Sequence, residues 1–280
     1  MKTLVVPTDF SSVSVNALNY AVDMAQAINA GLVLLHVYNV PVSFTEAPVA
    51  PVTSVSLEEV KRSSMERLEE LKKNLIILTS GKIQIYSESR LGEPIEELEA
   101  ICKSLDPMAV IMGSHGTTGF ERMIMGSTTL NAIKHIKCPV IVIPPGTTYN
   151  GIRKIGLACD FENVVQSTPV EYIKNIVKEF GADLYVLNVQ DKMNAETDES
   201  EPPTMDAVYL DSMLEEVRPN YVQLTGKNVV ESITSFAENN NLDLVMVIPK
   251  KHRFIDSLFH KSQSKELITH AHIPIVSIHE

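Results

Sequence analysis

Two stretches of this sequence decide how the chain is organised: residues 2–10, which read KTLVVPTDF, and residues 153–161, which read RKIGLACDF. Each is a short apolar run that ends in Asp-Phe, a pattern typical of a buried strand followed by a turn. The two halves also close alike, because residues 136–143 (IKCPVIVI) correspond to residues 271–278 (AHIPIVSI). The sequence therefore predicts a tandem repeat of two similar units.

The length of the chain agrees with two units, since 280 residues are enough for two domains of ordinary size. Residues 144–151, PPGTTYNG, have the Pro, Gly and polar composition of a linker. We expect a first domain over residues 1–146 and a second over residues 152–280.

Short apolar runs alternate with helical patterns in the first half. Five strands are predicted, over residues 3–6, 32–37, 83–86, 109–112 and 140–143. Apolar residues at helical spacing fall between them, as in Ala17, Leu18, Ala21, Val22, Ala25 and Ile28. This alternation predicts an α/β fold of two tandem, doubly wound, Rossmann-like domains, each with a five-stranded parallel sheet covered on both faces. Ligands of such sheets bind beyond the carboxyl ends of the strands.

Composition and charge limit the kinds of function that this protein could have. Hydrophobic residues make up 44% and charged residues 21%, a balance typical of folded proteins. The net charge of −11 argues against a general nucleic-acid binder, which needs a basic surface to displace counterions from phosphates. Small ligands and proteins are the expected partners.

The three cysteines, Cys102, Cys138 and Cys159, are widely spaced and odd in number. They indicate neither a disulfide framework nor a C-x-x-C site, and we expect buried, reduced thiols. The amino terminus runs directly into strand-like sequence, and no apolar run approaches the roughly 20 residues of a membrane span. We therefore expect a cytoplasmic protein without a membrane anchor.

Glycines gather after the fourth predicted strand, in residues 113–119 (GSHGTTG) and again in residues 126–129 (GSTT). Gly113 and Gly116 can present backbone amides to phosphate oxygens, and Gly126 and Ser127 open a helix whose dipole favours an anion. The alternative for any one of these glycines is an ordinary turn followed by a Ser N-cap.

The complete spacing, G-x-x-G, nine residues and then G-S after a strand, is similar to the nucleotide-binding signature of the universal stress protein family. The resemblance extends from Val5 through His36 and Val37 to Val140, and the second half repeats the outline without the glycines. It implies ATP as the ligand, with ADP or AMP as alternatives and Mg²⁺ as an accompanying ion.

The resemblance also implies a role for each site residue. Pro7, Thr8 and Asp9 would lie beside the adenosine, and Val37 and Met112 would flank the base. The ribose and phosphates would be surrounded by Gly113, His115, Gly116, Gly126, Ser127, Thr128 and Thr129. Asp9 has an alternative role as a turn or cap residue, because Asp160 takes its place in the half without glycines.

Three functions stay open for the first half. An ATP-binding regulatory protein of the stress response, acting on an unknown protein partner, is the leading hypothesis. Slow ATP hydrolysis is the second, with His115 as a candidate base, although no second group orients it and the G-x-x-x-x-G-K-[ST] motif is lacking. A nucleotide-free adaptor is the third.

The second half is predicted to bind no ATP. When Pro139 is set against Pro274, Ile248 falls at Gly113, Lys251 at Gly116 and Lys261 at Gly126. Side chains then stand where amides would have to contact phosphates. Of the motif only Ser262 survives, and the basic run at residues 250–253 could attract another anion or be a solvated charge cluster.

The family resemblance further implies how the two halves pack. Each half ends in a short apolar strand that would otherwise leave an open sheet edge. In the family these final strands pair between chains, so residues 140–143 and 275–278 are predicted to pair as an intramolecular pseudo-dimer. Whether two whole chains form a homodimer stays open.

Overall fold

The computed structural model describes residues 2–39, 54–114, 125–161, 164–190, 205–249, 267 and 272–279. The first half contains β1 (Thr3–Pro7), α1 (Ser12–Ile28), β2 (Gly31–Tyr38), α2 (Ser54–Leu78), β3 (Ile85–Leu91), α3 (Pro94–Leu105), β4 (Ala109–Gly113), α4 (Ser127–His135) and β5 (Val140–Ile143). The second half contains β6 (Lys154–Ala158), α5 (Val164–Ser167), α6 (Val170–Phe180), β7 (Asp183–Gln190), α7 (Met205–Leu214), the 3₁₀ turn η1 (Glu215–Val217), β8 (Asn220–Thr225), α8 (Val229–Asn239), β9 (Leu244–Val247) and β10 (Ile275–Ser277).

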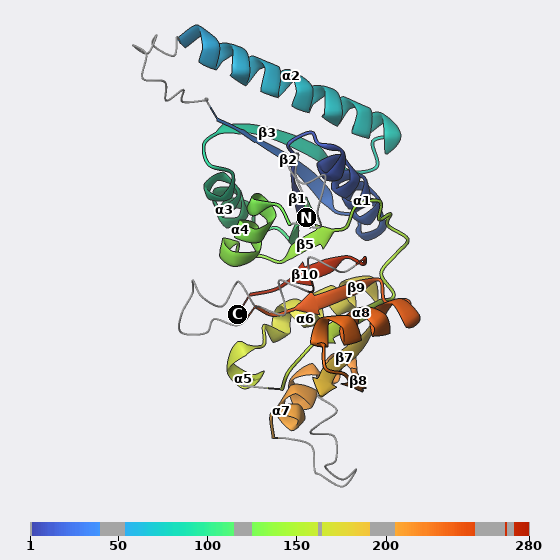
Figure 1. The fold of residues 1–280 in the computed structure, drawn as a ribbon. Coiled ribbons are helices and arrows are strands. Elements are labelled where there is room, and N and C mark those ends of the chain that lie inside the picture. Colours follow the sequence, from blue (N-terminus) through green and yellow to red (C-terminus); the bar gives the residue numbers. More distant parts are fainter. Residues whose placement is uncertain are drawn as a thin grey trace, which may run out of the picture.

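The described strands form one ten-stranded sheet in the order β3-β2-β1-β4-β5-β10-β9-β6-β7-β8. Strands within each half are parallel, whereas β5 and β10 pair antiparallel, with Ile141 opposite Val276. Figure 1 shows β5 and β10 side by side where the two halves meet. The predicted α/β fold of two doubly wound units is confirmed, and so is the pairing of their last strands.

The two faces of the sheet carry separate cores, because successive side chains of a strand point to opposite faces. Leu4 and Val6 of β1 pack with α1 and α2, while Val5 packs with α3 and α4. The antiparallel junction relates the halves by a rotation about an axis through the sheet, so equivalent helices share a face. The helices α5, α6 and α7 therefore extend the first core, and α8 extends the second.

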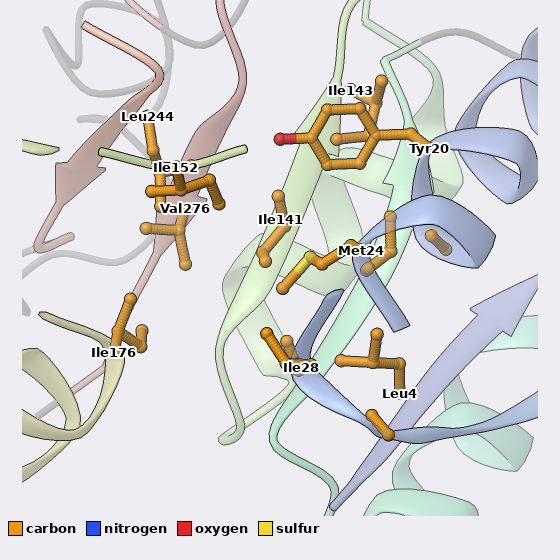
Figure 2. Close-up of a cluster of buried hydrophobic side chains, with 14 of the residues drawn as sticks. Leu4, Tyr20, Met24, Ile28, Ile141, Ile143, Ile152, Ile176, Leu244 and Val276 are labelled. Atoms are coloured by element: carbon orange, nitrogen blue, oxygen red, sulfur yellow. The ribbon is translucent and has the colours of Figure 1, made fainter. Parts of the chain in front are cut away.

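The first of these cores runs across the junction. Figure 2 shows Leu4, Met24 and Ile141 of the first half facing Ile152 and Val276 of the second within one cluster of buried apolar side chains. The two halves thus share a core as well as a sheet.

The connection between the halves also packs against the first one. Asn16 Nδ2 donates to the carbonyl oxygens of Pro144 and Thr147, both at 3.3 Å. The ring of Tyr149 meets the buried ring of Tyr20 edge to face, with centroids 5.2 Å apart. The segment predicted as a linker is therefore held against α1.

Two elements differ from their predicted form. The third strand was expected over residues 83–86 but runs over Ile85–Leu91, where its polar residues lie at the edge of the sheet. The counterpart of α1 in the second half is divided into α5 and α6, because Pro169 interrupts the helix and occupies the N-cap of α6. Among the described helices, none is long and apolar enough to cross a membrane.

Candidate functional site

The candidate site lies beyond the carboxyl ends of β1, β2 and β4. The winding direction reverses here, because β1 pairs with β2 on one side and with β4 on the other. The helices that follow these two strands, α1 after β1 and α4 after β4, consequently pack on opposite faces of the sheet. The strand ends between them are the usual place for a ligand in this class of fold.

The loop after β1 is a tight turn held by its own polar groups. The Thr8 side chain is buried, its hydroxyl lies 3.1 Å from that of Ser14, and its amide donates to the carbonyl of Leu35 at 2.8 Å. Asp9 is exposed, and its Oδ1 accepts from the Ser11 amide at 3.0 Å. Ser11 in turn caps α1 by accepting from the Ser14 amide.

These contacts lower the pKa of Asp9. Partial burial favours the neutral acid, but hydrogen bonds from the side chain and amide of Ser11 and from the Ser14 hydroxyl outweigh it and hold the pKa of Asp9 below its usual value. Near neutral pH the turn therefore presents an exposed carboxylate, which can accept hydrogen bonds from the amino group or hydroxyls of a nucleoside.

A cluster of Phe10, His36 and Arg67 supports the same turn, and it was not predicted from the sequence. Phe10 has a left-handed backbone (φ 62°), and its ring packs on His36 with centroids 4.5 Å apart. The Arg67 guanidinium of α2 covers that ring at 4.1 Å, and His36 Nδ1 lies 2.7 Å from the Thr8 carbonyl oxygen. Phe161 repeats the left-handed backbone in the second half (φ 54°), so the recurring Asp-Phe pair was the signal for this turn.

Gly113 ends β4 at a point of close approach to α1. A Cβ at this position would lie 2.5 Å from Val13 Cγ1 and 2.9 Å from the Val13 carbonyl oxygen. The Gly113 carbonyl accepts from the Thr129 hydroxyl at 2.9 Å, which ties the first turn of α4 to the strand. Gly113 thus holds the starts of two helices at one strand end, and the buried Thr129 hydroxyl has this structural partner.

The start of α4 lies beside the end of β4, with the side chains of Ser127 and Thr128 exposed. Gly126 is the N-cap residue, and no side-chain hydrogen bond caps this helix within the described part of the chain. The Gly126 amide donates to the Ser114 carbonyl at 3.0 Å, so this amide already has a protein acceptor. The amides of Ser127, Thr128 and Thr129 are the ones that helix geometry leaves without an intrahelical acceptor.

Pro7, Val37 and Met112 lie on three neighbouring strands. Pro7 ends β1, while Val37 of β2 and Met112 of β4 belong to the core on the α3 and α4 face of the sheet. Met112 is only 5% exposed, so a base could reach little of its side chain. His115 and Gly116 lie outside the described residues.

The second half has a different arrangement at the equivalent place. Ile248, aligned with Gly113, is half-buried against the core that includes Val164 of α5. Lys251, Lys261, Ser262 and the basic run at residues 250–253 lie outside the described residues. A surface groove lined by Lys227, Asn228 and Ser232 lies at the start of α8, which corresponds to α3 and not to α4. The groove is therefore not a second copy of the candidate site.

Metal ligands do not gather at the site in the described ranges, where no group of three His, Cys, Asp or Glu side chains could hold an ion. None of the three cysteines forms a disulfide. Cys138 is buried as expected, but Cys102 and Cys159 are only half-buried.

Comparison with known proteins places the chain in a family. The family model for the universal stress protein family matches residues 1–144 and again residues 151–279. Universal stress protein MJ0531 of Methanocaldococcus jannaschii is 30% identical over 142 residues, which are 51% of this chain and 81% of that protein. Universal stress protein YxiE of Bacillus subtilis is 28% identical over 146 residues, which are 50% of this chain and 97% of that protein.

A solved structure extends the likeness to the whole fold. A universal stress protein from Archaeoglobus fulgidus superposes with a TM-score of 0.70 at 19% identity, covering 99% of this chain and 96% of that one. The family resemblance inferred from the sequence is confirmed by the family model, which matches both halves. The chain is a tandem protein that belongs to the universal stress protein family.

Proposed function

We propose that the first half binds one adenine nucleotide, ATP in the first instance, and that the protein acts as a nucleotide-dependent regulator in the cytoplasm. The observation that carries this proposal is the position of Gly113, which lies against Val13 at the start of α1 and accepts from Thr129 in the first turn of α4. Among the described residues, no side chain caps this helix. One end of this site offers amides to an anion, and the other offers a carboxylate to a nucleoside.

In this proposal the phosphates of the nucleotide bind at the amino terminus of α4. The amides of Ser127, Thr128 and Thr129 point along the helix axis, and the helix dipole adds a positive potential there. The exposed hydroxyls of Ser127 and Thr128 supply further donors. ADP and AMP would use the same amides with fewer phosphate oxygens.

The nucleoside would then lie at the carboxyl ends of β1 and β2. The exposed carboxylate of Asp9, whose pKa is lowered by hydrogen bonds from Ser11 and Ser14, would accept from the ribose or the adenine amino group. Pro7 and Val37 would provide apolar contact for the base, with Met112 below them. Any Mg²⁺ that accompanies ATP would be held mainly by phosphate oxygens, since the described residues offer no cluster of metal ligands.

The second half would not share this ligand. The half-buried side chain of Ile248 takes the place of Gly113, so the strand end that α4 approaches in the first half is altered in the second. Calorimetry should consequently give one nucleotide per chain. Binding at saturating ATP, about 100 times the dissociation constant, would stabilise the protein by about 2.7 kcal/mol.

The most direct test changes Gly126, the N-cap residue of α4, which has no side chain to cap the helix. In Gly126→Asp the new carboxylate can accept from the α4 amides, as an N-cap Asp does, so the helix stays stable while the phosphate site is occupied. ATP affinity should fall at least tenfold without a lower unfolding midpoint. Asn228→Asp is the matched control, because it adds the same charge at α8, where Asn228 already caps the amides of Val230 and Glu231.

Three results would contradict the proposal or modify it. Unchanged affinity in Gly126→Asp would remove the phosphate site from α4. Absence of any ATP-induced stabilisation in the unmodified protein would favour the nucleotide-free adaptor. Release of phosphate at a rate proportional to enzyme concentration would favour the hydrolase.

A further inference from the structure

Two of the three cysteines lie together although they are far apart in the sequence. Cys102 is in the last turns of α3, and Cys138 is in the segment between α4 and β5. Their sulfur atoms are 3.3 Å apart, with the Cys138 thiol donating to Cys102 Sγ. Cys138 is 6% exposed and Cys102 is half-buried, so a small solute has access to Cys102 first.

We propose that Cys102 and Cys138 form a redox-active thiol pair, which a hydroperoxide oxidises to an intramolecular disulfide. A disulfide requires the sulfur atoms to approach to about 2.05 Å, so the pair must close by a little over 1 Å. A movement of this size is within reach of small side-chain rotations. Disulfides in proteins of a reducing compartment are typically transient and redox-sensing, which fits a pair that the fold holds close but unbonded.

The hydrogen bond between the thiols assigns their roles. It stabilises the thiolate of Cys102 and so lowers the pKa of Cys102, although burial opposes this. The same hydrogen bond, together with burial, raises the pKa of Cys138. Cys102 is therefore the sulfur that attacks the oxidant, and Cys138 is the resolving thiol.

The proposed reaction balances in two steps. The Cys102 thiolate attacks one oxygen of the hydroperoxide, the O–O bond breaks, and the leaving oxygen takes up a proton, which yields a sulfenic acid and water or an alcohol. Cys138 sulfur then attacks Cys102 sulfur, loses its proton, and displaces hydroxide as a second water. The two thiols are oxidised by two electrons, and the peroxide is reduced by two.

The remaining cysteine provides an internal control. Cys159 follows β6 in the second half and lies 3.4 Å from the Phe161 amide, which donates to its sulfur. Like Cys102 it is half-buried, so it reports what peroxide does to a thiol of similar exposure without the Cys138 partner.

The test exposes the reduced full-length protein to hydrogen peroxide, alkylates the remaining thiols and measures the intact mass. We expect the mass to fall by two hydrogen atoms before alkylation, alkylation at Cys159 alone, and a tryptic product that joins the peptides of Cys102 and Cys138. A dithiol reductant should restore alkylation at all three positions. The product should migrate as a monomer on a non-reducing gel.

Cysteine-to-serine variants distinguish formation of the sulfenic acid from formation of the disulfide. Cys138→Ser should stop at the sulfenic acid, so dimedone should label Cys102, whereas Cys159→Ser should form the bond like the unmodified chain. The proposal would be overturned if peroxide converted Cys102 to a sulfinic acid without the linked peptide, if Cys102 and Cys159 reacted equally, or if only bonds between chains formed. Because mapping of the unmodified protein decides these outcomes, the proposal does not depend on the folding of any variant.

Discussion

Gly113 is the residue on which the candidate site depends most directly for its shape. A methyl group here would come within 2.5 Å of Val13 Cγ1 and 2.9 Å of the Val13 carbonyl, both at the start of α1. We predict that Gly113→Ala lowers the free energy of unfolding by about 1–3 kcal/mol, because either β4 or α1 must move to admit the methyl group. Urea denaturation followed by circular dichroism would measure the loss.

A second substitution checks the stated cause. Val13→Ala removes the closer of the two contacting atoms but leaves the carbonyl in place. The double variant should therefore recover part of the stability that Gly113→Ala loses, which a double-mutant cycle would record as a favourable coupling. Full stability of Gly113→Ala alone would show that the strand end is not constrained by α1.

The same residues show how far the sequence could predict the site. The spacing of Gly113 and Gly126 indicates positions where the backbone approaches another group closely, and the group predicted from the sequence was a phosphate. For Gly113 one such neighbour is Val13, a hundred positions earlier in the chain, and for Gly126 the amide partner is Ser114. The proximity of Cys102 to Cys138 was invisible for the same reason. Spacing along a chain identifies a residue type that is needed, but the contacting group comes from another element.

At the scale of elements, apolar patterns predicted the buried strands well and the edge strand poorly. The strands β1, β4 and β5 lie inside the sheet and are almost entirely apolar, so their predicted and observed bounds nearly coincide. The outer strand β3 continues through polar residues instead. There Ser89 bonds to Ser64 of α2 at 2.6 Å, and Arg90 pairs with Glu88 and with Glu97 of α3. Hydrophobic periodicity carries no signal for a strand stabilised in this way.

The connection between the halves is an element whose role we can test. Tyr149 contributes an aromatic contact to the buried ring of Tyr20, and such a pair is worth about 0.5–1.5 kcal/mol beyond the area it buries. We predict that Tyr149→Ala lowers the free energy of unfolding by about 1–3 kcal/mol. Tyr149→Phe keeps the ring and should change it by less than about 0.5 kcal/mol. Equal losses in the two variants, measured in urea, would assign the effect to the hydroxyl instead of the ring contact.

For the whole molecule, the antiparallel pairing of β5 with β10 determines how firmly the two halves are associated. Three residue pairs join β5 to β10, and the core of one sheet face continues across them (Figure 2). His279 of the second half bonds to the Ile133 carbonyl of α4, and Lys2 pairs with Glu179 at 2.6 Å. These contacts hold the halves together independently of the connecting segment.

We therefore predict that the halves stay associated when the connection is cut. A protease site inserted after Asn150, which is exposed, would allow cleavage of the folded protein. The cleaved chain should elute from size exclusion at the volume of the intact protein, because separation would expose the unpaired edges of β5 and β10 and the apolar residues between them. Ile141→Asp places a charge opposite Val276 in this buried junction, so its cleaved halves should separate on dilution. If the cleaved parent chain separated just as readily, the peptide connection, and not the shared sheet and core, would be what holds the two halves together.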